Sequence, residues 1–248
     1  DIMIFHNPIS QIPSRYNFTL KHLINNSKIV FDSKGNLSEF RKVHKSFYNC
    51  NIINTGVDSK YFKSERCEKT NNYLNLISIS AFEKRKGISY LIKSMPILID
   101  KIPEIRLVII GSGAEKNYYE DLINKLRIQK YVMIKPAVDD TKPYLLDSDI
   151  YCLLSHGEGC PIGLLEAMAC ELPSIVSDKS PFDEIISMNE GIQVDRDDTK
   201  AILSAVLKLR KKNIRKKMGK KARQKIINKF TWEIVSSKFS SLIDNRNF

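Results

Sequence analysis

Residues 149–171 read D-I-Y-C-L-L-S-H-G-E-G-C-P-I-G-L-L-E-A-M-A-C-E, and this stretch decides the fold class. An apolar run, I-Y-C-L-L, precedes a polar loop that contains two glycines, and a second apolar stretch with helical spacing follows the loop. Apolar strands without polar alternation are typical of a parallel sheet that helices cover on both faces. The stretch therefore predicts one strand, one loop and one helix of a doubly wound α/β domain.

The same alternation of short strands and longer helices extends from residue 74 to the C-terminal region. The predicted strands are Leu74–Ser80, Ile105–Ile110, Tyr131–Ile134, Asp149–Leu154, Ser174–Ser177 and Gly191–Val194. The predicted helices are Ile88–Lys101, Lys116–Arg127, Pro143–Asp147, Ile162–Glu171, Pro181–Met188, Thr199–Lys211, Ile214–Lys229 and Thr231–Leu242. Ligands of doubly wound folds bind beyond the carboxyl ends of the strands. We therefore expect the chemistry in the loops 81–87, 111–114 and 155–161.

The first 57 residues predict a smaller piece of structure. Strands are expected at Ile2–Phe5, Lys28–Phe31 and Asn51–Ile53, and helices near residues 14–25 and 36–44. Because so short a segment buries too little surface for an independent core, residues 1–57 are expected to be the last part of a second Rossmann-like domain that is incomplete here. Residues 58–228 would form the main domain. Residues 229–248 would form a helix that packs back towards the first domain, with Trp232 anchoring that helix in a core.

The composition describes an ordinary globular protein, with 42% hydrophobic residues, 27% charged residues and a net charge of +12. The positive charge is densest in residues 208–229, for which two interpretations stand: a solvated helix face, or a surface for anionic lipid headgroups. No helix-turn-helix, zinc or RNP-like signature accompanies the lysines, so we expect no nucleic-acid partner.

The cysteines and the lengths of the apolar runs indicate the cellular compartment of the protein. The five cysteines form no C-x-x-C pair, and those at positions 152, 160 and 170 lie in apolar stretches typical of a core. Unpaired thiols suit a reducing compartment, and no apolar run approaches the ~20 residues that cross a bilayer. We expect a cytoplasmic protein with peripheral contact at the inner face of the membrane.

The loop and helix after residue 154 carry the candidate site. Pro161 stands where a helix makes its first turn, and the free N–H groups and positive dipole of a helix N-terminus bind anions such as a diphosphate. Glu158 lies in the loop and Glu166 about one turn inside the helix, so both carboxylates can border one crevice, where a carboxylate can hold a vicinal diol. The alternative is a capping acid and a solvated helix residue. Glu166 is embedded in L-L-E-A-M-A-C, however, where an unpartnered charge would be costly.

The stretch E-G-C-P-I-G-L-L-E-A-M-A-C-E-L-P resembles the signature of the family 4 retaining glycosyltransferases, also called glycosyl transferases group 1, which have the GT-B fold. The resemblance runs in order from residue 51 to about residue 243 and includes T-G-V-D, K-G, V-I-I-G-S-G, F-D-E-I-I and F-T-W. It implies an α/β architecture of the GT-B type. The doubly wound nucleotide-sugar domain would be residues 58–228, and residues 1–57 would belong to the incomplete acceptor-side domain.

The resemblance also implies roles for individual residues. Glu166 would hold the ribose hydroxyls of a nucleoside diphosphate sugar, Glu158 would contact the donor sugar, and Lys86 in E-K-R-K-G would offset charge on the departing diphosphate. His6 would lie near the reactive carbon of the sugar. The remaining candidates are Gly159, Cys160, Pro161 and Ile162 along the diphosphate and sugar, and Gly111 and Gly113 beside the nucleotide. On the residues alone, an ordinary tight turn and a surface histidine explain the last two glycines and the histidine equally well.

One position departs from the family pattern. Family members carry a Gly-Arg or Ser-Arg pair after the first strand of this domain, whereas the pair here is Ser80-Ala81. Arg85 or Lys84 would have to supply the second cation from a different spacing.

The predicted function is that of a retaining glycosyltransferase of the EC 2.4 class. It would move a sugar from a UDP-, GDP- or ADP-sugar to a hydroxyl of a glycan, a polysaccharide or a lipid-linked acceptor. No cofactor is implied, and no metal-ligand spacing stands in the sequence. Two alternatives remain: a truncated or partner-dependent nucleotide-sugar binding module without turnover, and a sugar-nucleotide epimerase of similar architecture.

Overall fold

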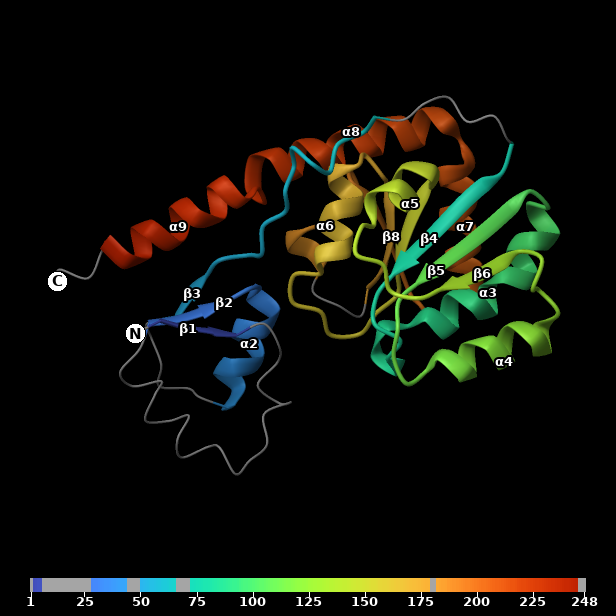
Figure 1. Cartoon of the computed structure of the whole chain (residues 1–248), viewed down its shortest axis with the longest axis horizontal. Coiled ribbons are helices and arrows are strands. Elements are labelled where there is room, and N and C mark those ends of the chain that lie inside the picture. The colour runs from blue at the N-terminus through green and yellow to red at the C-terminus, as the bar shows by residue number, and fades with distance from the viewer. Residues whose placement is uncertain (1, 6–27, 44–49, 66–71, 179–181, 245–248) are drawn as a thin grey trace.

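The structure of the 248-residue chain is a computed structural model that describes residues 2–5, 28–43, 50–65, 72–178 and 182–244. Two parallel sheets organise these residues (Figure 1). The smaller sheet has the strand order β1-β2-β3, and the larger has the order β6-β5-β4-β7-β8-β9.

The larger sheet consists of six parallel strands. They are β4 (Leu74–Ile79), β5 (Ile105–Ile110), β6 (Val132–Lys135), β7 (Ile150–Leu153), β8 (Ser174–Ser177) and β9 (Gly191–Val194). After β4 the chain first builds the sheet in one direction, through β5 and β6, and then returns to add β7 on the other side of β4. The point between β4 and β7 is therefore a topological switch point, where such sheets bind ligands.

Helices cover both faces of this sheet (Figure 1). One face packs against α3 (Ile88–Lys101), α4 (Lys116–Leu126) and α7 (Thr199–Arg210), and the other against α5 (Lys142–Asp147) and α6 (Ile162–Ala169). Helix α8 (Lys212–Lys229) contributes Met218 to the first core and Ala222 and Ile226 to the second. Within β5, Leu107 and Ile109 join the first core and Ile110 the second, as the alternation of side chains along a strand requires. The doubly wound α/β fold predicted from the apolar strands is confirmed.

One predicted helix is wrong. Instead of a helix over residues 181–188, the structure has a single 3-10 turn, Phe182–Glu184, and residue 181 lies outside the described residues. The carbonyl of Phe182 accepts from the backbone N–H groups of both Ile185 and Ile186. The next donor, the N–H of Ser187, bonds to the Glu190 carboxylate at 2.7 Å instead of continuing a helical ladder. This competing side-chain acceptor ends the turn.

The smaller sheet packs between two helices. It contains β1 (Ile2–Phe5), β2 (Lys28–Phe31) and β3 (Cys50–Ile52), with α2 (Lys34–Val43) on one face and α9 (Trp232–Asp244) on the other. The rod formed by α8 and α9 thus runs from the larger sheet to the smaller one (Figure 1). The predicted helix near residues 14–25 lies outside the described residues.

Trp232 is not the core anchor that the sequence suggested, because its side chain is 51% exposed. Its ring lies at the first turn of α9, over the backbone of Gly56, where an added Cβ would be 2.8 Å from the ring. Gly56 belongs to the segment that joins the two sheets. Val235, one turn later and 4% exposed, takes the anchoring place against the smaller sheet.

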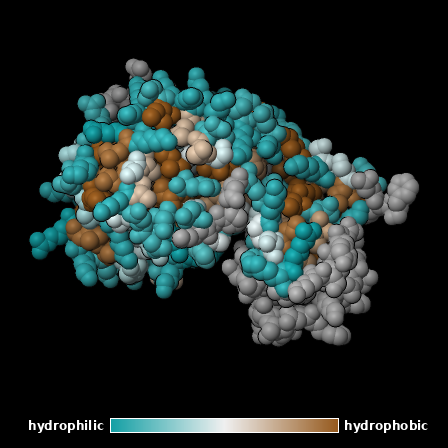
Figure 2. Space-filling model, turned by 180° about the vertical axis from the view of Figure 1, so that it is seen from behind, coloured by the Kyte–Doolittle hydropathy of each residue, from teal (hydrophilic) through white to brown (hydrophobic). Residues whose placement is uncertain are grey.

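The surface is hydrophilic over most of the face in Figure 2, with apolar residues in separate patches. None of the helices within the described ranges is long and apolar enough to cross a membrane.

Candidate active site

The loops that follow β4 and β7 meet at the switch point. Gly87, at the end of the first loop, has φ 71° and lies so close to the Leu154 carbonyl that any Cβ would overlap it. The N–H of His156 donates to the carbonyl of Arg85 at 2.8 Å. Glycine is required at this contact, and the contact brings the short 3-10 turn Lys84–Lys86 against the loop 155–161.

Lys86 and Glu158, both predicted site residues, form an ion pair across this contact. The Lys86 Nζ lies 2.7 Å from Oε1 and 2.9 Å from Oε2 of Glu158. The two side chains are 14% and 7% exposed. A buried carboxylate requires such a partner, so each charge holds the other in place.

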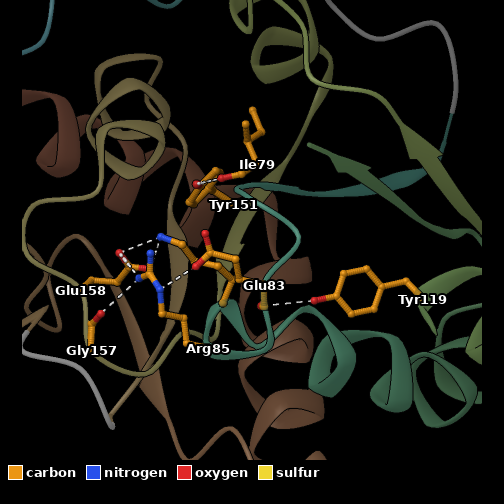
Figure 3. A network of polar contacts seen from close by, with 8 residues as sticks. Ile79, Glu83, Arg85, Tyr119, Tyr151, Gly157 and Glu158 are labelled. Carbon is orange, nitrogen blue, oxygen red and sulfur yellow. Dashed lines mark hydrogen bonds and ion pairs between the residues drawn. The ribbon is translucent and has the colours of Figure 1, made fainter. Parts of the chain in front are cut away.

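Arg85 is the second cation at this loop (Figure 3). Its Nε donates to Glu83 at 2.7 Å, and its Nη1 lies 3.4 Å from the Gly157 carbonyl and 3.7 Å from the Glu158 carboxylate. Lys84 is exposed. Of the two candidates for a second cation, Arg85 is therefore the one that reaches the loop after β7.

The loop then enters α6 through the predicted residues. Pro161 is the N-cap of α6, and Ile162, its first residue, is 53% exposed. The free N–H groups of this helix end thus lie beside an accessible side chain. Cys160 is buried, and burial raises the pKa of its thiol to about 12, so it stays neutral and serves packing.

Gly159 faces the smaller sheet. A Cβ on this residue would lie 2.6 Å from Oδ1 of Asp32 and 2.7 Å from the amide nitrogen of Asn36. Asp32 and Asn36 are both buried, and the Asn36 amide donates to Asp32 at 2.7 Å. The donor loop predicted from sequence therefore touches both α/β parts of the molecule.

Glu166 lies inside α6 and is held by a residue from another loop. Thr141, just before α5, donates its hydroxyl to Oε2 of Glu166 at 2.8 Å. Burial raises the pKa of Glu166, the Thr141 hydrogen bond lowers it in part, and the charge of Asp140 raises it again. Thr141 thus donates to one oxygen of the carboxylate, and within the described residues no hydrogen bond reaches the other oxygen.

Tyr151 lies close enough to both glutamates for their charges to act on its hydroxyl. Its side chain is fully buried in β7, and its hydroxyl donates to the Ile79 carbonyl at 3.0 Å (Figure 3). Burial, followed by the charges of Glu166 and Glu158, raises its pKa. A Cβ on Gly163 would come within 2.8 Å of the hydroxyl, so the tyrosine also fixes how closely α6 approaches the sheet.

Gly111 and Gly113 follow β5 and line the neighbouring loop. Added Cβ atoms would overlap the Ser80 carbonyl at Gly111 and come within 2.6 Å of the Phe82 carbonyl at Gly113. The two glycines therefore allow the loops after β4 and β5 to pack against each other. His6 lies outside the described residues.

Sequence reasoning missed Thr141, Tyr151 and Asp32. A tyrosine inside the apolar run I-Y-C-L-L was a signal for a buried hydroxyl in need of a partner. Thr141 and Asp32 stand in ordinary polar loops, where only the tertiary structure reveals their neighbours.

A family profile, glycosyl transferases group 1, matches residues 59–225, which is well over half of the chain. The chain belongs to this family. A Haemophilus influenzae protein named as an uncharacterized glycosyltransferase is 33% identical over 137 residues, which cover 55% of this chain and 38% of that protein. The capsular polysaccharide biosynthesis glycosyltransferase CapM of Staphylococcus aureus is 26% identical over 229 residues, which cover 90% of this chain and 59% of CapM. This group 1 chain thus spans about half the length of the curated relatives that it matches.

Solved structures confirm the GT-B fold for this group 1 protein. Sucrose-phosphate synthase from Thermosynechococcus elongatus superposes with a TM-score of 0.86 at 19% identity, over 98% of this chain and 67% of that one. Anabaena HepE in complex with UDP and glucose gives a TM-score of 0.85 at 14% identity, over 98% and 71% of the two chains. At these identities the likeness establishes the fold alone.

Proposed function

We propose that the chain is the donor-side portion of a retaining glycosyltransferase that uses a nucleoside diphosphate sugar. The observation that carries the proposal is the meeting of Lys86, Glu158 and the N-terminus of α6 at the switch point of the larger sheet. A cation and a helix N-terminus suit the diphosphate. Carboxylates suit the hydroxyls of ribose and sugar.

The proposed chemistry is the departure of the diphosphate from the anomeric carbon of the sugar. As the carbon–oxygen bond breaks, negative charge collects on the diphosphate, and Lys86, Arg85 and the N–H groups at Ile162 stabilise it. Released from Lys86, Glu158 then accepts hydrogen bonds from the donor sugar. Gly159, Cys160 and Pro161 belong to the same loop, and Gly111 and Gly113 would lie beside the nucleotide. His6, which lies outside the described residues, keeps only the role near the reactive carbon that the family resemblance implies.

Glu166 holds the ribose diol in this proposal. Thr141 occupies one side of its carboxylate, and the partial exposure of Glu166 leaves the other side accessible. A carboxylate with a raised pKa and one vacant oxygen gains more from two hydroxyl donors than a solvated carboxylate would.

The names of relatives suggest the classes of donor and acceptor. HepE is solved with UDP and glucose, so a UDP-sugar is the first donor to test, followed by GDP- and ADP-sugars. CapM is named for capsular polysaccharide biosynthesis, and a Mycobacterium leprae relative is a phosphatidyl-myo-inositol mannosyltransferase. A glycan or lipid-linked hydroxyl is the corresponding acceptor class.

Titration calorimetry with UDP, GDP and ADP tests the donor site. We expect one nucleotide to bind the chain and Glu166→Ala to weaken that binding at least tenfold, whereas Glu120→Ala, an exposed glutamate on α4, leaves it unchanged. Arg85→Ala should also weaken it, and Lys84→Ala should not. Equal binding by the wild type and Glu166→Ala, or no binding by either, would refute the proposal.

A binding module without turnover is the second candidate. It is favoured by the absence of a cation at Ala81, which is exposed at the end of β4. Release of free sugar or transfer of sugar from the bound nucleotide sugar excludes it. Product analysis for an isomerised sugar tests the epimerase alternative in the same reaction.

A further inference from the structure

The outer face of α8 carries the densest charge of the described structure. The helix, K-N-I-R-K-K-M-G-K-K-A-R-Q-K-I-I-N-K, has nine basic residues among its 18 and no Asp or Glu. The chain as a whole mixes both signs, with 28 acidic and 40 basic residues over its full length. A general abundance of lysine in the chain does not explain why acids are missing from this one helix.

The charges of α8 are sorted by face. Its buried residues, Met218, Gly219, Ala222 and Ile226, lie on the side that packs against α6, α7 and β9 of the larger sheet's layers. Lys216, Lys217, Lys220 and Lys221 are exposed on the opposite side. Residues three and four positions apart share a helix face, so these four lysines form one continuous stripe, named here the lysine face.

The ion pairs that the structure describes for α8 lie off the lysine face. The ion pairs of α8 use Arg215 with Asp149 and Lys225 with Glu190, at the flanks of the buried side. Within the described part of the chain, no carboxylate pairs with any of the four lysines of the face. Like charges four residues apart weaken a helix, so the face does not serve the stability of α8.

An apolar side chain extends the lysine face. Ile227 is 44% exposed and stands seven residues, or two helical turns, after Lys220. It therefore projects from the same side of the helix as the lysines. Lysines beside an exposed aliphatic group are the composition of a helix that lies on an anionic membrane.

We propose that the lysine face of α8, with Ile227, binds the surface of a bilayer that contains anionic lipids. Lysine is a flexible point charge that suits mobile headgroups, whereas arginine, with its planar fork, suits fixed phosphates. The residues of α8 include no aromatic side chain to stack on a base, which argues against a nucleic acid. A bilayer is the flat, extended anionic partner that matches an 18-residue helix along the edge of the molecule (Figure 1).

Contact through this face leaves the candidate active site open. Gly219 of α8 packs on the Glu171 carbonyl, just after the C-terminal end of α6, whereas the site lies at the N-terminal end of α6. The bound protein would hold the site beside the membrane without covering it. The proposal does not depend on the proposed function, because it rests on different residues.

Sedimentation of the full chain with lipid vesicles tests the proposal. Vesicles of phosphatidylcholine are compared with vesicles that also contain phosphatidylglycerol, for the wild type and for Lys216→Gln, Lys217→Gln, Lys220→Gln and Lys221→Gln combined. Each lysine near an anionic surface strengthens binding about fivefold, so we expect the fourfold variant to bind anionic vesicles at least ~100-fold more weakly. Ile227→Asn alone should also weaken binding to anionic vesicles, but by less than the fourfold lysine variant does.

The matched control carries the same change of charge elsewhere. Lys93, Lys125, Lys130 and Lys200 are exposed on other helices and loops, and their combined change to Gln should leave vesicle binding within about threefold of the wild type. Circular dichroism confirms that both variants fold, and nucleotide binding reports separately on the donor site. Equal weakening by both variants, equal binding to neutral vesicles, or tighter binding of a single-stranded RNA than of anionic vesicles would overturn the proposal.

Discussion

The ion pair between Lys86 and Glu158 is expected to stabilise the fold around the larger sheet, in addition to its proposed role in ligand binding. A double-mutant cycle with Lys86→Met, Glu158→Gln and the combined variant measures it. Each single change leaves one charge without its main partner in a site where the side chains are only 14% and 7% exposed. The combined change removes both charges together, so its cost should be smaller than the sum of the two.

The magnitude follows from the burial and from Arg85. Breaking a buried pair by removing one partner costs about 3–5 kcal/mol. The Arg85 Nη1 remains 3.7 Å from Glu158 and compensates part of the lost charge in Lys86→Met, so we expect a loss of about 2–4 kcal/mol for that variant. For a protein of this size, such a loss lowers the melting temperature by about 5–12 °C. The coupling between the two residues should be about 2 kcal/mol.

Thermal and denaturant unfolding provide the assay, and a surface pair provides the control. The Lys60 Nζ lies 2.7 Å from Oε1 of Glu233, the same distance as in the buried pair, but these side chains are 85% and 62% exposed. Exposed pairs stabilise little at any distance, so the same cycle at Lys60 and Glu233 should show no measurable coupling. The reasoning is refuted if the Lys86–Glu158 coupling is as small as that of the surface pair.

Other positions give sharp outcomes as well. Because burial raises the pKa of Glu166, the free protein should gain stability as pH falls through the folded-state pKa, whereas nucleotide affinity, which needs the ionised form, should fall over the same range. Glu166→Gln should remove both effects, as unfolding and calorimetry between neutral and mildly acid pH will test. Thr141→Val removes the donor that lowers this pKa and should move the midpoint upward, whereas Thr141→Ser should not. Gly157→Ala, with φ 75° and open space around the new Cβ, should cost only about 1–2 kcal/mol. Gly87→Ala, which overlaps the Leu154 carbonyl, should cost clearly more in the same denaturation assay, and equal costs would contradict the packing of the two loops.

The strands of the larger sheet could be read from sequence because their apolar runs are continuous and short. Ile105–Ile110, Ser174–Ser177 and Gly191–Val194 have the predicted bounds. The prediction of a helix over residues 181–188 was wrong because the spacing of apolar residues does not reveal a side-chain acceptor. Here the Glu190 carboxylate accepts from the Ser187 N–H and ends the turn. The prediction that Trp232 is a core anchor was wrong because residue type predicts burial only on average. Trp232 lies where the chain passes from one sheet to the other, and its side chain is 51% exposed there.

The sequence nominates residues for the candidate site, but it does not predict the contacts between them. Lys86 and Glu158 are 72 positions apart, and nothing local to either residue states that β4 and β7 are neighbours. The same limit applies to Thr141 and Glu166, which are 25 positions apart. Motif spacing predicts which loops would bind a ligand, and strand order decides which side chains come into contact.

Glu158 and Glu166 have opposite surroundings in the free protein, and this difference affects how the parts of a nucleotide sugar would bind. Glu158 is satisfied by Lys86 in the free protein, whereas Glu166 has one hydroxyl donor and a raised pKa. A ribose diol would therefore stabilise Glu166 by adding hydrogen-bond donors to its carboxylate. A diphosphate that binds Lys86 would instead break the ion pair of Glu158 and leave a buried carboxylate without its cation, which is destabilising. The hydroxyls of the donor sugar can offset that loss by donating hydrogen bonds to Glu158. A nucleotide that carries its sugar should accordingly engage Lys86 more readily than the nucleotide alone, which couples sugar recognition to stabilisation of the leaving group.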